Sequence, residues 1–369
     1  MSTSKITSYT TSSEQLKEIA LLAAELGVVA LDTEFVWERT FYPNLGIVQL
    51  ALPNGFSTII DTTIIEDCSA LGDILEDEKI VKILHDSTQD LTILYNLTGA
   101  YPKNIFDTQR AAGFMGLPCT ISLANLLKES VGIELAKTET RTNWLKRPLS
   151  EKQIEYALDD VKYLEKTREV ILNAITSTTV LRWLEMDMKE LENRELYHTI
   201  DPSNAYLKIK GRNRLRGHEL AILQNLAEWR ELKARDRNIP REFVITNKQL
   251  LTIAKIDKFS TQNLLKNSEL NDRKVKRNID SIIKICTKDI DPATYPKSPK
   301  KVTKSTSIRV KKITDKVLLK IKERSASAGI DYALVFSRAK IGGLISNPKN
   351  RVMGWRAELI GDVINDAKL

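Results

Sequence analysis

The sequence lacks the features that would place the protein in a membrane, in an oxidising compartment or around a zinc ion. No apolar run in its 369 residues approaches the length of a membrane span. The N-terminus, MSTSKITSYTTSSEQLKEIA, has no basic stretch followed by an apolar one, so no signal peptide is expected. Cys68, Cys119 and Cys286 are odd in number and form no CxxC pair, which argues against a zinc site and a disulfide framework. We expect a cytoplasmic protein without membrane association.

The charge of the chain is divided unequally between its two halves. Residues 1–200 contain 19 Lys and Arg against 30 Asp and Glu, a net charge of −11. Residues 201–369 contain 37 against 18, a net charge of +19. Because basic and apolar residues alternate in stretches such as LRGHELAILQNLAEWRELKARDRNIP, the second half is expected to fold. A basic folded half of this kind favours nucleic acid as a partner, with an anionic membrane surface as the weaker alternative.

The first half has the pattern of an α/β domain. Short apolar runs separated by Pro, Asn and Gly predict three strands in succession, and strands that alternate with helices follow. This order predicts a mixed sheet with helices packed on it. The expected strands cover residues 28–35, 45–52, 57–61, 80–84 and 104–107, and the expected helices cover residues 89–97, 122–131 and the stretch after Ser150.

The second half shows no alternating strands and is expected to be entirely helical. One group of helices is predicted from about residue 214 to residue 288. The stretch from 291 to 306, DPATYPKSPKKVTKST, is rich in Pro, Lys, Ser and Thr and is the best candidate for a linker. A smaller helical unit is predicted after it.

Two acids in the first predicted strand suggest a metal site. In ALDTEF, Asp32 and Glu34 are two residues apart, so both side chains are expected on one face of a central strand. Two buried carboxylates repel each other unless a positive charge lies between them. Mg²⁺ or Mn²⁺ fits, because these ions take oxygen ligands and need no Cys or His. A strand end with its polar residues in water is the alternative.

Further acids follow the fourth predicted strand, in ILHDSTQDL. Asp90 lies in the first turn of the next helix, near the strand end where α/β active sites usually lie. Ser87 and Asp90 also form a capping pattern, so Asp90 can instead serve the helix. His85 is expected to be a satisfied core or rim residue. Asp107 in IFDTQ is expected to be mainly a helix N-cap.

The helix in LSEKQIEYALDDVKYL contains adjacent acids. Ser150 and Gln153 predict a capping box, and apolar residues at intervals of three and four predict a core-facing stripe. Tyr156 and Asp160 lie one above the other on one flank of this stripe, whereas Asp159 points elsewhere. A solvated acidic face would also account for this helix.

These motifs together closely resemble bacterial ribonuclease D, a family of 3′–5′ exoribonucleases. The resemblance rests on ALDTEFVWERTFYPNLGIVQLA, ILHDSTQDLTIL, FDTQRAAGFMG, TETRTNWLKRPLSEKQIEYALDDVKYL and GWRAELIGD. It implies a ribonuclease-H-like mixed sheet followed by helical HRDC modules. The expected organisation is an exonuclease domain over residues 1–203, an HRDC helical domain over 208–290, a linker over 291–306 and an HRDC-like helical domain over 307–369.

The resemblance also implies roles for particular residues. The family's four metal-binding acids correspond to Asp32, Glu34, Asp90 and Asp160, and its conserved tyrosine corresponds to Tyr156. A related subgroup of these exonucleases has a histidine in the same motif, at the position that Glu155 occupies in this chain. This chain therefore matches the subgroup that has the tyrosine instead. The expected reaction is removal of nucleoside 5′-monophosphates from an RNA 3′ end with two Mg²⁺ or Mn²⁺ ions. Precursor tRNA is the expected substrate, and a monomer without an obligate protein partner is expected.

Residues that contact nucleic acid are predicted less directly. Phe35 adjoins the acids and could stack on a terminal base or belong to the core. The basic half is expected to contact phosphates through its densest cations, although any one of them can simply face solvent. These cations are Arg212, Arg214, Arg216, Arg230, Lys233, Arg235 and Arg237. A DNA 3′ exonuclease would use the same four acids and stays open. A binding module with a dead exonuclease site is disfavoured by the complete set of acids.

Overall fold

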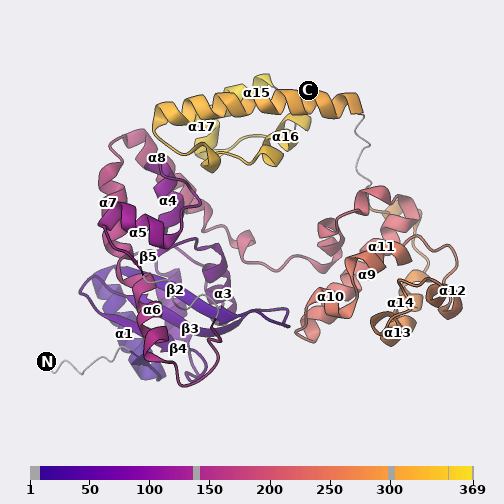
Figure 1. The fold of residues 1–369 in the computed structure, drawn as a ribbon, viewed down its shortest axis with the longest axis horizontal. Helices are drawn as coiled ribbons and strands as arrows, with labels where there is room; N and C mark the ends of the chain where they lie inside the picture. Colours follow the sequence, from indigo (N-terminus) through magenta and orange to yellow (C-terminus); the bar gives the residue numbers. More distant parts are fainter. Residues whose placement is uncertain (1–8, 136–141, 298–303, 348, 368–369) are drawn as a thin grey trace. The chain divides into compact units, whose positions relative to one another are not determined.

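The computed structural model describes residues 9–135, 142–297, 304–347 and 349–367, and it forms two compact units (Figure 1). The first unit contains Met1–Val36, Leu45–Tyr197 and Val302–Leu369. The second contains Trp37–Asn44 and His198–Lys301. Within the described ranges, the helices are too short or too polar to cross a bilayer.

A six-stranded mixed sheet lies at the centre of the first unit. Its strand order is β1-β4-β3-β2-β5-β6. β3 pairs antiparallel with β4, whereas β1 with β4, β2 with β5, and β5 with β6 are parallel pairs. The mixed sheet expected from the sequence is therefore confirmed. The strands are β1 (Tyr9–Thr10), β2 (Val28–Val36), β3 (Asn44–Ala51), β4 (Ser57–Asp61), β5 (Val81–Leu84) and β6 (Ile105–Asp107).

Helices cover the sheet and bury a large and a small cluster of apolar side chains with it. Strand β2 is central, and its Val29, Ala30 and Leu31 are almost completely buried. The helix before it was not predicted: it is capped by Ser12 and ends at Gly27, whose φ of 70° favours glycine. The helices of this part are α1 (Ser13–Leu26), α2 (Ser69–Glu76), α3 (Thr88–Thr98), α4 (Thr108–Phe114), α5 (Leu123–Val131), α6 (Glu151–Lys162), α7 (Leu164–Ala174) and α8 (Thr178–Glu190), with a 3₁₀ turn at Arg194–Leu196.

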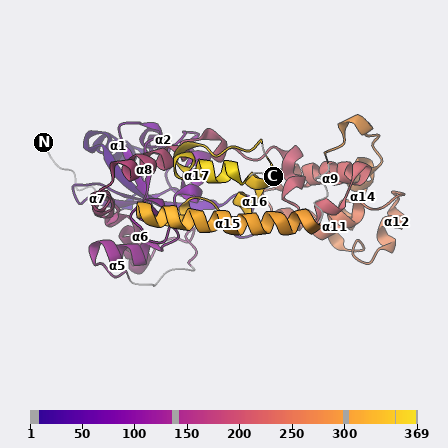
Figure 2. The same ribbon diagram turned by 90° about the horizontal axis from the view of Figure 1, so that it is seen from above.

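The C-terminal helices belong to the same unit as the sheet. They are α15 (Lys304–Ala328), α16 (Arg338–Ser346) and α17 (Gly354–Asp366), with a 3₁₀ turn at Tyr332–Leu334. Figure 2 shows α15 and α17 side by side, and α17 also contacts α8. Trp355 is 0% exposed and packs its ring 5.1 Å from that of Phe114 and 6.0 Å from that of Trp183. These helices therefore share one hydrophobic core with the sheet.

The second unit is helical, as expected, and has a core of its own. Its long central helix α9 (Gly217–Asp236) buries Leu220, Ile222, Leu223 and Leu226 against the shorter helices. The other elements are α10 (Arg241–Val244), α11 (Asn247–Ile253), α12 (Thr261–Lys266), α13 (Arg273–Arg277) and α14 (Ile279–Cys286), with 3₁₀ turns at Pro202–Lys208, Arg212–Arg214 and Pro292–Thr294. The predicted linker, 291–306, lies partly outside the described residues, and α15 begins within its predicted span at Lys304.

Candidate active site

The four predicted metal ligands come from three elements of the first unit. Asp32 and Glu34 lie on β2, Asp90 lies in the first turn of α3, and Asp160 lies on α6. β2 pairs with β5, the strand that leads into α3, and α6 contacts β2. The fold therefore brings residues far apart in the sequence to one place, and we refer to Asp32, Glu34, Asp90 and Asp160 as the acid cluster.

The electrostatics of the acid cluster show that its members lie close together. Burial raises the pKa of Asp32 well above its usual range, and the charges of Asp90, Asp160 and Glu34 raise it further. Burial likewise raises the pKa of Glu34 to about 8, and the charges of Asp160 and Asp90 add to this effect. Burial raises the pKa of Asp90 to about 6 and that of Asp160 to about 7. Each carboxylate therefore resists ionisation mainly because it is buried, and for Asp32 and Glu34 the charges of the other acids in the cluster add to this effect.

This donor set suits a hard divalent cation. Carboxylate oxygens are the ligands that Mg²⁺ and Mn²⁺ prefer, and a cation removes the repulsion that raises these pKa values. In the described part of the chain, no three His, Cys, Asp or Glu side chains stand close enough together to ligate one ion. Ligation would therefore require the carboxylates to turn toward one another, which becomes favourable once a cation cancels their repulsion.

Helix α6 is held at its N-terminus by a capping box and by a buried ion pair. Ser150 accepts a hydrogen bond from Gln153 N at 3.3 Å, and the Gln153 side chain accepts one from Ser150 N at 2.9 Å, as predicted. Just before the helix, the Arg147 guanidinium bonds Asp61 of β4, which is 0% exposed, and donates to the carbonyl of Gly46 at 2.9 Å. The position of Asp160 is thus fixed relative to the sheet.

Gly46 of β3 lets the chain before α6 approach the sheet closely. A Cβ atom at this position would lie 2.4 Å from the carbonyl oxygen of Trp144, a distance that real Cβ atoms essentially never show. Trp144 is 3% exposed and forms a small core cluster with Ile47, Ile59 and Ala157. Glycine is therefore required at position 46 for α6 to lie across the strands.

Tyr156 lies on α6 one turn before Asp160. Its ring is half-buried, with its centroid 6.2 Å from that of Trp144. Asp159 is also half-buried, and burial raises its pKa. Its charge raises the pKa of Asp160, so it lies near the acid cluster without being predicted as a ligand.

The turn into α3 differs from the capping pattern expected there. The Ser87 side chain makes no capping hydrogen bond to α3, so the predicted Ser87–Asp90 capping pattern is wrong. The Ser87 hydroxyl instead donates to Asp107 Oδ2 at 2.8 Å, and Ser87 N donates to the same oxygen at 2.8 Å. Asp107 also caps α4 as predicted, through Gln109 N and Arg110 N. His85 has partners on both ring nitrogens, Thr108 Oγ1 and the carbonyl of Ile121.

Sequence reasoning missed the part played by Thr33, the residue between the two acids of β2. Its hydroxyl donates to Asp90 Oδ1, and its side chain is 5% exposed. Strand alternation gave no signal for this contact, because it predicts that Thr33 points away from Asp32 and Glu34. Phe35 is half-buried and lies outside the three hydrophobic clusters formed by the described residues, so its stacking role stays a prediction.

Three of the seven cations predicted to contact phosphate, Arg230, Lys233 and Arg235, bind groups from other segments of the second unit. Arg230 is 3% exposed and donates to the carbonyl of Ile245, so burial contradicts a phosphate contact for it. Arg235 bonds the buried carboxylate of Glu231 at 2.9 Å and also the carbonyl of Ile200. Lys233 donates to Asn278 at 2.6 Å and lies over the ring of Trp229. We infer that these three cations mainly stabilise the helical unit.

The remaining four cations differ in exposure. Arg214 and Arg237 are exposed, whereas Arg212 and Arg216 are half-buried. The Arg216 guanidinium is bonded to backbone carbonyls, and that of Arg212 to the side chain of Asn213. Arg214 and Arg237 are therefore the strongest candidates for phosphate contacts among the seven.

Comparison with known proteins assigns both halves of the chain. Residues 7–176 match the family model of a 3′–5′ exonuclease, and residues 219–286 match that of the HRDC domain. The ribonuclease D of Pseudomonas paraeruginosa is 33% identical over 350 residues, which cover 92% of this chain and 91% of that protein. The ribonuclease D of Desulfotalea psychrophila is 49% identical over 243 residues, which cover 66% of this chain and 65% of that protein.

The fold has a close counterpart among solved structures. The crystal structure of Escherichia coli RNase D, described as an exoribonuclease involved in structured RNA processing, superposes with a TM-score of 0.86. The sequence identity is 28%, and the match covers 97% of each chain. A protein from Bifidobacterium adolescentis shares the fold with a TM-score of 0.68 at 19% identity.

Proposed function

This chain belongs to the ribonuclease D family and is a 3′–5′ exoribonuclease, and we propose that its acid cluster hydrolyses RNA with two divalent metal ions. The products are nucleoside 5′-monophosphates released one at a time from the 3′ end. The observation that carries the proposal is the effect of three acids on the fourth: Glu34 of β2, Asp90 of α3 and Asp160 of α6 all raise the pKa of Asp32. Such an arrangement is costly for the apo protein and is explained by a cation that the acids hold.

Asp32 and Glu34 of β2, Asp90 of α3 and Asp160 of α6 would hold the two ions through their carboxylate oxygens. When bound, the pair of Mg²⁺ or Mn²⁺ ions would lower the pKa of water and stabilise charge on the phosphate. The acids must be ionised for this, so their raised pKa values imply that metal binding releases protons.

Tyr156 would orient the attacking water by a hydrogen bond. A neutral phenol hydroxyl both donates and accepts hydrogen bonds, so orientation of the water is the role that its chemistry allows. The packing of its ring against Trp144 limits the positions that its hydroxyl can reach.

The basic second unit would recruit the substrate. Its net positive charge attracts a polyanion, whereas the acidic first half repels phosphate. The name of the Escherichia coli counterpart includes structured RNA processing, and precursor tRNA with a 3′ trailer is the substrate that we propose here. We also propose that the protein acts as a cytoplasmic monomer.

The experiment is incubation of the purified full-length protein with tRNA that carries a labelled 3′ trailer. We expect mononucleotides to appear in Mg²⁺ or Mn²⁺, none to appear in EDTA, and trimming to stop near the acceptor stem. The Asp160→Asn variant serves as the inactive control, and a DNA strand of the trailer sequence tests RNA selectivity. Hydrolysis that persists in EDTA, or that survives in the Asp160→Asn variant, would contradict the assignment of the acid cluster.

A further inference from the structure

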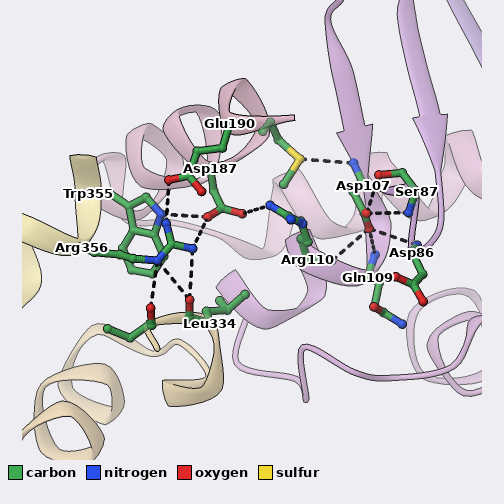
Figure 3. A network of polar contacts seen from close by, with 12 residues as sticks. Asp86, Ser87, Asp107, Gln109, Arg110, Asp187, Glu190, Leu334, Trp355 and Arg356 are labelled. Atoms are coloured by element: carbon green, nitrogen blue, oxygen red, sulfur yellow. Dashed lines mark hydrogen bonds and ion pairs between the residues drawn. The ribbon is translucent and has the colours of Figure 1, made fainter. Parts of the chain in front are cut away.

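Asp107 connects two helices that begin at the same edge of the sheet. It ends β6, is 1% exposed, and accepts five hydrogen bonds with its two carboxylate oxygens. Gln109 N and Arg110 N donate to Oδ1 at 2.9 and 3.2 Å and make Asp107 the N-cap of α4. The other donors, Asp86 N, Ser87 N and Ser87 Oγ, belong to the turn between β5 and α3 (Figure 3).

The turn that Asp107 holds has an unfavourable backbone conformation. Asp86 has a φ of 58°, in the left-handed region that residues other than glycine rarely adopt. The next residue, Ser87, is 0% exposed, so its N–H and hydroxyl have no access to water. Buried donors need partners, and Asp107 Oδ2 accepts from both at 2.8 Å. This carboxylate therefore stabilises the turn in its observed shape.

The shape of this turn determines the position of Asp90. Helix α3 begins at Thr88, and Asp90 lies in its first turn, so a shift at Ser87 moves Asp90 directly. On its other side, Asp90 accepts a hydrogen bond from Thr33 of β2. Asp90 is thus held between the strand with the other acids and a helix start that Asp107 fixes.

We propose that Asp107 is a positioning residue, which places Asp90 for metal binding through the Asp86–Ser87 turn. The proposal rests on the function proposed above for the acid cluster. The role goes beyond the capping of α4, because capping uses only Oδ1, whereas Oδ2 binds Ser87. Removal of residues that orient metal ligands typically lowers metal affinity or activity by about 10- to 100-fold.

The substitution Asp107→Asn separates the two roles. Asparagine is as good an N-cap as aspartate, and its oxygen can still accept from Gln109 N and Arg110 N. Its amide nitrogen would then face Ser87 N, so that two donors meet and the Ser87 N–H loses its partner. Ser87→Ala is a milder second variant, because it removes the hydroxyl donor alone.

Asp331→Asn is a matched control in the same unit. Asp331 also caps a short helix, through Ala333 N, and also accepts from a distant backbone N–H, that of Cys119 at 2.8 Å. In the described part of the chain, its side-chain hydrogen bonds reach only Ala333 and Cys119 and not the turn into α3.

The measurements are the Mg²⁺ dependence of RNA hydrolysis by the full-length protein and the rise in melting temperature caused by Mn²⁺ without RNA. For Asp107→Asn we expect the Mg²⁺ concentration at half-maximal activity to rise about tenfold or more. Saturating Mg²⁺ should restore turnover to within a few-fold of wild type, with KM for RNA little changed. The Mn²⁺-induced shift should shrink, Ser87→Ala should give a smaller effect in the same direction, and Asp331→Asn should leave both readouts unchanged.

Two results would overturn the inference. One is a wild-type metal dependence in both Asp107→Asn and Ser87→Ala, which would show that Asp107 only caps α4. The other is an equal loss in Asp331→Asn, which would show a general effect of stability. Failure of the proposed function looks different, because wild-type protein itself would then show neither metal-dependent hydrolysis nor a Mn²⁺-induced shift.

Discussion

Asp187→Asn tests whether the C-terminal helices are an integral part of the exonuclease unit. Asp187 lies on α8 and is 1% exposed. Its Oδ1 accepts from Trp355 Nε1 at 2.9 Å and from Arg356 Nη2 at 2.8 Å, and its Oδ2 accepts from Arg110 Nη1 at 3.2 Å. Figure 3 shows this carboxylate between two guanidinium groups. It is the buried anion that connects α17 to α8 and α4.

The expected cost follows from this burial. Asparagine keeps the shape of the side chain, but it removes the negative charge between Arg110 and Arg356 and places a donor where one oxygen accepted. Loss of one partner from a buried ionic network costs about 3–5 kcal/mol, and the remaining amide oxygen offsets part of this. We therefore expect a loss of about 2–4 kcal/mol. In a unit of this size, this corresponds to a fall in melting temperature of roughly 5–15 °C.

The assay is differential scanning calorimetry of the full-length protein, together with limited proteolysis of the α15–α17 segment. The matched control is Arg182→Gln, which breaks the exposed ion pair of Arg182 with Glu358 between the same two helices. Solvent screens this pair, so its loss should change the melting temperature little. One result would refute this reasoning: Asp187→Asn lowers the melting temperature no more than Arg182→Gln, and α15–α17 stay equally resistant to protease. The buried network would then not hold the C-terminal helices.

The other predictions concern the acid cluster and the basic unit. Asp160→Asn should nearly abolish hydrolysis with the fold intact, whereas Asp159→Asn should do far less; the opposite result, in single-turnover assays, would show that the ligand is misplaced by one residue. Tyr156→Phe should reduce turnover by roughly ten- to a thousandfold with metal affinity little changed, and wild-type turnover would remove the hydroxyl from the mechanism. In EDTA, the stability of the protein should fall as pH rises through about 6 to 8. The reason is that these acids have higher pKa values in the folded protein than in the unfolded chain. They therefore contribute stability that is fully present below about pH 4 and is lost as they ionise. Melting curves should show a smaller fall in Asp160→Asn or in saturating Mg²⁺, and an equal fall in all three would refute this origin. Arg214→Gln and Arg237→Gln should each weaken tRNA binding and lower the slope of log K against log salt by about 1, and an unchanged slope would show that neither contacts phosphate.

The elements around the acid cluster could be predicted because their sequence patterns are local. Alternation and turn residues predicted β2, β3 and β4 to within one residue or so at each end. The capping box at Ser150 predicted where α6 begins, and helical spacing then placed Asp160 beside Tyr156. The assignment of Asp160 as a ligand and of Tyr156 to catalysis came from the family resemblance and stays a prediction, because no three acids in the described residues stand close enough together to ligate one ion.

Local sequence patterns gave wrong predictions where a side chain has a stronger partner that is distant in the sequence. Ser87 has the spacing of a capping residue toward Asp90, but its hydroxyl binds Asp107, which is 20 residues away in the sequence. A charged acceptor with two buried oxygens competes well against a neutral capping bond. Arg230 and Arg235 appeared to be surface cations because the sequence shows that a helix is basic without showing that Glu231 lies buried beside them.

The ending of the chain illustrates what a pattern cannot show. In GWRAELIGD, apolar spacing predicts a helix with one buried face, but no local signal says which surface covers that face. The structure gives three of its side chains polar partners on α8: Trp355 and Arg356 bind Asp187, and Glu358 binds Arg182 and Trp183.

The same contacts bear on the active site through Arg110, which belongs to two networks. Its guanidinium binds Asp187 beneath the C-terminal helix, and its backbone N–H donates to Asp107, which holds the turn before Asp90 (Figure 3). A chain ended near residue 203 would therefore lose more than the basic helices that recruit RNA. It would expose the core around Phe114 and Trp183 and leave Asp187 with one cation, so weaker catalysis by such a fragment would not by itself measure the contribution of RNA binding.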